Sequence, residues 1–225
     1  MLFYISFLLI FVACDSDSVP IEATSGQALV SYARGFKVFE FDTNYVIVIG
    51  ENRYSFSKNL KNSTYVLSGV TQLQFLKALN EDTSIIGLFD ANYFNDSSIF
   101  SRLAKSEMLN FKQANSPDWE LLVKHSGSIV LGYSSFDLDA LMVKNLNLTI
   151  LPINEFQENH PLGKAEWIKV FGVISGKFSL ADSIFRKIEE RYLAAKPTSN
   201  DSSHKPKVIA GIRKLGDTKS NTNCP

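Results

Sequence analysis

Residues 158–172 read ENHPLGKAEWIKVFG, and the fold is decided around this stretch. A polar turn leads into a helix predicted from Leu162 to Ser175, which stops at Gly176. A second, longer helix then begins with Ser179 as its cap and ends at Lys196-Pro197. Its apolar residues fall on one face, as expected for a helix that packs on a core: Ala181, Ile184, Phe185, Ile188 and Tyr192.

Upstream of this stretch, short apolar segments alternate with segments of helical periodicity. Strands are predicted at residues 65–67, 84–89, 128–132 and 148–151. Helices are predicted from Thr71, which has capping-box spacing to Gln74, from Ser116-Pro117 through Lys124, and at residues 138–144. This alternation predicts an α/β fold with a Rossmann-like parallel sheet that carries helices on both faces.

The segments outside this alternation also predict particular elements. Residues 36–41 and 45–49 are rich in aromatic and β-branched residues around a turn at residues 42–44, which predicts a β-hairpin. Residues 52–62 are polar and predict a connection. Another strand is expected at residues 208–211, directly before a polar tail.

The first residues predict an export signal. Residues 2–12 form an apolar run that is too short to cross a bilayer but has the length of a signal-peptide core. Residues 11–14, FVAC, resemble a lipobox, in which the cysteine is lipidated and becomes the new N-terminus. We therefore expect a signal peptide at residues 1–13, lipidation at Cys14 and a tether at residues 14–29. Because the segment before the apolar run has no Lys or Arg, an ordinary secretory signal or a start further upstream is the alternative.

Composition argues against several classes of function. The 23 Lys and Arg residues balance the 23 Asp and Glu residues, so no net charge attracts nucleic acid. Cys14 and Cys224 are the two cysteines, and lipidation of the first leaves neither a disulfide nor a cysteine zinc site. The three histidines lack paired spacing, so neither His160 nor Glu166 predicts a metal site.

The sequence matches no enzyme motif well. The segment GVISGK at residues 172–177 lacks the spacing and the hydroxyl residue of a phosphate-binding loop, and the chain has no Gly-x-Ser-x-Gly elbow. We therefore expect a protein that is not an enzyme and that holds no cofactor.

The opening stretch resembles a signature of one family. The pattern E-x-x-P-L-G-[RK]-A-E-W-I-K-[FL] is typical of the class III substrate-binding proteins of ABC importers for iron-siderophores and cobalamin. Weaker matches lie in the same order at residues 33–36, 68–71 and 117–122, whereas residues 123–130 depart from the family's usual turn. The resemblance implies an N-terminal lobe at residues 30–178 and an interlobe backbone helix at residues 179–196. It also implies that residues 197–225 are a linker and the start of a C-terminal lobe that is otherwise missing, as in a truncated product.

Ligands of two-lobed α/β binding proteins lie outside the carboxyl ends of the parallel strands. The loops expected there carry the predicted ligand-binding residues, whose aromatic rings could pack on a planar chelate: Thr71, Tyr93, Phe94, Tyr133 and Phe136, with Phe156 close by. For any one of these aromatic residues, packing on the sheet edge is an equally good interpretation.

Glu120 is the predicted contact with the transporter. In proteins that this chain resembles, a glutamate in this part of the lobe docks into an arginine pocket of the permease. The alternative is a solvated glutamate that complements a helix dipole. The resemblance thus implies a lipid-anchored protein of the cell envelope that delivers an iron-siderophore, haem or cobalamin to an ABC permease. A lipid-anchored interaction module without transport activity is the competing hypothesis.

Overall fold

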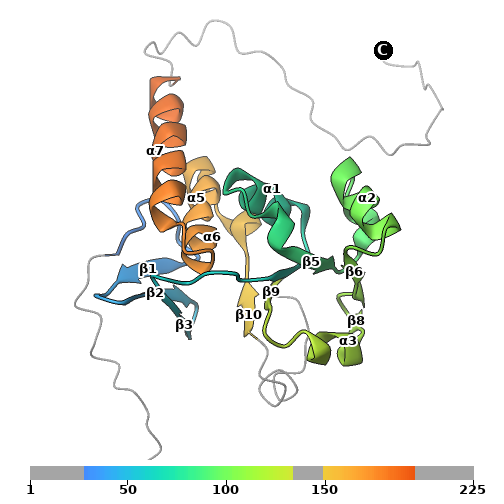
Figure 1. Cartoon of the computed structure of the whole chain (residues 1–225). Helices are drawn as coiled ribbons and strands as arrows, with labels where there is room; N and C mark the ends of the chain where they lie inside the picture. The colour runs from blue at the N-terminus through green and yellow to red at the C-terminus, as the bar shows by residue number, and fades with distance from the viewer. Residues whose placement is uncertain (1–27, 134–148, 196–225) are drawn as a thin grey trace, which may run out of the picture.

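The computed structural model describes residues 28–133 and 149–195 (Figure 1). The helix predicted at residues 138–144 and the strand predicted at residues 208–211 lie outside the described residues, as do Cys14 and Phe136. Within the described ranges, no helix combines the length and the apolar character needed to cross a membrane.

A five-stranded parallel sheet forms the centre of the structure. Four of its strands were predicted from the alternating sequence, and the fifth, at residues 109–110, was not. Its strands lie in the order β10-β9-β4-β5-β6, and every neighbouring pair is parallel. The central strands β4 and β9 are buried along their whole length, because helices cover both faces of the sheet. The bounds are β4 Tyr65–Leu67, β5 Ile85–Leu88, β6 Leu109–Asn110, β9 Ile129–Gly132 and β10 Thr149–Pro152.

Helices and short 3-10 turns lie between these strands and after β10. They are α1 Val70–Ala78, α2 Ser97–Ala104, α3 Trp119–Lys124, α5 Pro161–Glu166, α6 Ile168–Ile174, α7 Phe178–Ala194, η1 Asp82–Ser84, η2 Ala91–Tyr93 and η3 Glu155–Gln157. Helix α1 buries Leu73, Leu76 and the adjoining Leu79, whose spacing places them on one face. Helix α7 stands beside α5 and α6 (Figure 1) and buries Ala181 and Phe185.

The predicted hairpin is part of a three-stranded antiparallel sheet. Strands β1 (Lys37–Glu40) and β2 (Asn44–Ile49) pair as expected, and β3 (Asn52–Ser57) adds to β2. The prediction of a polar connection over residues 52–62 is therefore wrong for its first half. Polar residues of β3 alternate with Tyr54 and Phe56, which pack against the core, so the sheet keeps one face in water.

Three helix starts differ from the prediction. Ser116–Pro117 is strand β8, which pairs with β7 (Lys112–Gln113), and Asp118 caps α3 by accepting a hydrogen bond from the Leu121 amide. Helix α1 begins at Val70, where the Gln72 side chain accepts from the Ser68 and Gly69 amides.

Helix α7 begins at Phe178 after Lys177, not at a Ser179 cap. The helix predicted from Leu162 is the pair α5 and α6, which meet at the buried Trp167.

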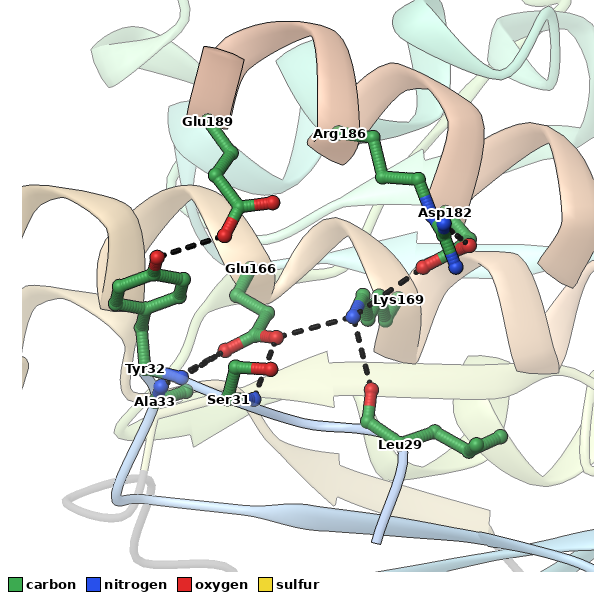
Figure 2. A network of polar contacts seen from close by, with 9 residues as sticks. All are labelled: Leu29, Ser31, Tyr32, Ala33, Glu166, Lys169, Asp182, Arg186 and Glu189. Atoms are coloured by element: carbon green, nitrogen blue, oxygen red, sulfur yellow. Dashed lines mark hydrogen bonds and ion pairs between the residues drawn. The ribbon is translucent and has the colours of Figure 1, made fainter. Parts of the chain in front are cut away.

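The signature stretch holds the N-terminal segment in place. The fully buried carboxylate of Glu166 accepts hydrogen bonds from the backbone amides of Ser31, Tyr32 and Ala33 at 2.7–2.9 Å (Figure 2). Lys169, also buried, donates to Glu166 and to the Leu29 carbonyl and pairs with Asp182 of α7. A buried charge pair is tolerated only where its hydrogen bonds are satisfied, as they are here.

A second buried glutamate repeats this arrangement. Glu158 accepts from the backbone amides of Arg34 and Gly35 and from the indole N–H of Trp167. The residues of the signature that look like metal or ligand contacts in the sequence are therefore engaged with the protein's own backbone. Gly172, the last residue of the signature stretch, allows α6 and α7 to pack closely. A Cβ there would overlap the side chain of Ala181 on α7.

Candidate functional site

The carboxyl ends of three neighbouring strands bring polar and aromatic side chains together. Thr71 lies in the first turn of α1 directly after β4, Tyr133 follows β9, and Glu155 lies in η3 after β10. In parallel α/β sheets this edge is where ligands bind. We call Thr71, Tyr133, Glu155 and Phe156 the edge cluster. Two of these, Thr71 and Tyr133, were predicted site residues, and the structure places them next to each other.

Glu155 is the buried member of the edge cluster. It is 5% exposed, and its Oε1 accepts a hydrogen bond from the Thr71 hydroxyl. Its other oxygen, Oε2, is buried and has no hydrogen-bond partner among the described residues. The sequence gives no signal for this residue, because one glutamate in a polar loop looks like any solvated acid until the fold buries it.

Tyr133 lies against the start of α1. A Cβ at position 69 would overlap the Tyr133 hydroxyl and ring carbon, so Gly69 leaves the space that the tyrosine occupies. The ring meets Phe156 edge-on, with centroids 5.4 Å apart. Burial raises the pKa of Tyr133, and the charge of Glu155 acts in the same direction, while a contact with Thr71 opposes them. Tyr133 is therefore a neutral hydroxyl at physiological pH.

The other predicted ligand-binding residues have different positions. Phe94 is 1% exposed and packs in the hydrophobic core, so its prediction as a ligand contact is wrong for this conformation. The 3-10 turn η2 accounts for the error, because it leaves Phe94 facing the core while Tyr93 is 77% exposed. Phe136 lies outside the described residues, and its role stays a prediction.

A cavity of about 590 Å³ opens beside the loop that follows β10. It is lined by Arg34, Gly35, Ile49, Gly50, Asn52, Pro152, Asn154, Gln157, Glu158 and Asn159. Its volume lies in the range of small-molecule sites, and its amide and guanidinium groups suit a polar ligand. Residues 152–159 line part of this cavity, but no member of the edge cluster does, so the cavity and the edge cluster are separate features.

Glu120 is exposed, as predicted, although its helix is capped by Asp118. Its side chain is 82% exposed and pairs with Lys124 at 2.8 Å. The amide of Asp118 donates to the carbonyl of Phe111, which directly follows β6, so the first turn of α3 lies near the carboxyl end of that strand. A solvated rim position of this kind is compatible with docking, which stays a prediction.

Among the described residues, no group of three His, Cys, Asp or Glu side chains is arranged to hold a metal ion. The GVISGK segment has a structural role. Its Lys177 ammonium donates hydrogen bonds to the carbonyls of Leu79 and Asn80 at the end of α1.

Comparison with known proteins begins with the sequence. No family model matches the chain. An uncharacterized lipoprotein of Methanocaldococcus jannaschii is 26% identical over 160 residues, which are 67% of this chain and 37% of that protein. The chain thus spans little more than a third of the curated relative that it matches.

Solved structures give the fold. The iron-uptake system-binding protein FeuA of Bacillus subtilis matches with a TM-score of 0.50 and 14% identity, over 69% of this chain and 53% of that protein. The periplasmic haem-binding protein HutB of Vibrio cholerae matches with a TM-score of 0.48 and 12% identity, over 62% of this chain and 52% of that protein. The described residues therefore share the α/β fold of FeuA, of which this chain covers about half.

Proposed function

We propose that this chain contains the N-terminal lobe, residues 30–178, and the backbone helix of an ABC importer's substrate-binding protein for a metal chelate. The observation that carries this proposal is the edge cluster, which sets an aromatic pair and a buried carboxylate at the carboxyl edge of the sheet. The shared fold and the signature resemblance support it. A ferric siderophore is the ligand we favour, with haem and cobalamin as the related candidates.

The same proposal places the protein outside the cytoplasm, on the cell envelope. Its lipoprotein relative and the apolar run that ends at Cys14 support a lipid anchor at that cysteine. Delivery then requires a permease in the same membrane. Glu120 is our proposed docking residue, because an exposed carboxylate on the rim can orient a partner that presents guanidinium groups.

Titration of the full chain, kept in mild detergent, tests ligand binding. Ferrioxamine B, haem and cobalamin are added while tryptophan fluorescence is recorded. We expect binding weaker than sub-micromolar, because a two-lobed site buries most of its ligand and the described lobe supplies only one wall. Tyr133→Ala and Phe156→Ala should weaken binding at least fivefold. Phe100→Ala, which removes an exposed aromatic residue outside the predicted site, should leave binding unchanged.

The titration has clear negative outcomes. The absence of binding to all three compounds would count against a chelate-binding function and favour a lipid-anchored interaction module. Sub-micromolar affinity would show instead that one lobe is sufficient.

Docking is tested separately in cells. In a version that carries a second lobe, Glu120→Ala should leave ligand affinity unchanged and reduce uptake, because a rim charge mainly orients the encounter. Lys124→Ala, which removes the partner of Glu120 on the same helix, is the control and should preserve uptake. Normal uptake by Glu120→Ala would exclude the docking role, and loss of ligand binding would assign the residue to the pocket or the fold.

A further inference from the structure

The described part of the chain buries four charged side chains almost completely, and one of them is incompletely bonded. Glu158 and Glu166 each receive several N–H donors, and Lys169 faces Glu166, Asp182 and the Leu29 carbonyl. Glu155 is the exception within these residues, because its Oε2 receives no donor. A buried carboxylate oxygen without a donor is unfavourable, so such groups in native proteins are completed by water, an ion or a ligand.

The position of Glu155 argues that the missing donor belongs to a ligand. Glu166 and Lys169 join the N-terminal segment to α5, α6 and α7 (Figure 2). Glu158 joins the same segment to Trp167. Glu155 lies instead at the carboxyl edge of the sheet. Its neighbours there include Thr71 and Phe156, which is 53% exposed. The carboxylate is thus hydrogen-bonded to an exposed residue in the first turn of α1.

We propose that Glu155 is the recognition point for a hydrogen-bond donor on the ligand, and specifically for a protonated amine. An ammonium group supplies both the missing donor and the opposite charge, whereas an anionic or acceptor-only group at the same place leaves the buried charge uncompensated. Tyr133 is a partly exposed neighbour of the carboxylate. Thr71 holds the other oxygen and so fixes the orientation of the carboxylate.

The inference rests on the proposed chelate-binding function and narrows it to chelates that carry an amine. Two ferric trihydroxamates provide the test. Ferrioxamine B ends in a free ammonium group, and its N-acetyl derivative has the same iron-binding groups without that charge. The full chain in mild detergent should bind ferrioxamine B about tenfold more tightly than the acetylated form. In Glu155→Gln, which keeps the size of the side chain and an acceptor for Thr71, the two affinities should become equal.

Glu190→Gln is the matched control, because it removes an exposed carboxylate of α7 and should preserve the tenfold preference. Equal affinity of the unaltered chain for the two chelates overturns the inference whether or not the variant folds, and leaves the proposed function standing. A preference that survives in Glu155→Gln overturns it as well, as does binding of haem or cobalamin but of neither ferrioxamine. If none of the four compounds binds, the proposed function itself fails.

Discussion

Replacement of Glu166 by glutamine should destabilise the fold more than any single exposed charge does. Oε2 of Glu166 accepts from the Tyr32 and Ala33 amides, and Oε1 accepts from the Ser31 amide and the Lys169 ammonium (Figure 2). Whichever way a glutamine amide is turned, its NH₂ group faces two donors where an acceptor is needed. The change also leaves Lys169 buried with one carboxylate fewer, since Asp182 at 3.3 Å is its remaining ion-pair partner among the described residues.

The expected cost follows from these contacts. Hydrogen bonds to a charged group contribute about 1.5–3 kcal/mol each, and removal of one partner of a buried ion pair costs about 3–5 kcal/mol. We expect a loss of about 3–5 kcal/mol in the free energy of unfolding, which is a large part of the 5–15 kcal/mol typical of a domain. The melting temperature should fall by about 10 °C.

Urea unfolding followed by the fluorescence of the buried Trp167 measures this loss. Glu120→Gln makes the same chemical change at an exposed, singly paired position and should cost about 0.5 kcal/mol or less. If the two variants lose similar stability, the hydrogen bonds of Glu166 contribute no more to the fold than an exposed ion pair does.

Three further outcomes are expected. Gly172→Ala should cost about 1–2 kcal/mol in urea unfolding, because the added methyl overlaps Ala181 between α6 and α7; unchanged stability would mean that these helices are not packed this closely. The ion pair with Lys77 lowers the pKa of Asp96 to about 2, so its contribution of about 1 kcal/mol is complete above pH 4 and is lost between pH 4 and pH 2. Asp96→Asn, which keeps the cap of α2, should lack this part of the pH dependence, and identical pH profiles would refute the assignment. Cys14→Ser should release the protein from membranes and block its processing, and unchanged fractionation and mass would exclude the lipid anchor.

The central sheet could be predicted because its strands are apolar on both faces. A run such as residues 129–131, buried from end to end, fits a covered parallel strand and little else. Strand β3 could not be found in this way, because one face is in water and its polar residues look like a loop. The start of α3 was misplaced because Ser116 and Asp118 are both good caps, and only the pairing of β7 with β8 decides between them.

The site was predictable only in part, for a related reason. Thr71 and Tyr133 could be placed at the carboxyl edge from strand order alone, since each follows a predicted strand. Glu155 could not, because its burial depends on how η3 packs against the start of α1, which are far apart in sequence. The inward position of Phe94 depends on a single 3-10 turn, and composition does not distinguish it from the exposed Tyr93.

The buried glutamates differ in what they bind: two of them bind the protein's own backbone, and the third keeps one oxygen without a donor. Glu158 and Glu166 are the sequence features that make the chain resemble a family, and both are bonded to the backbone of residues 31–35. Glu155 lies outside that network and retains an oxygen without a donor, so a change there alters no contact of the signature. Glu155→Gln should therefore change amine selectivity without changing the hydrogen bonds that Glu158 and Glu166 make to residues 31–35.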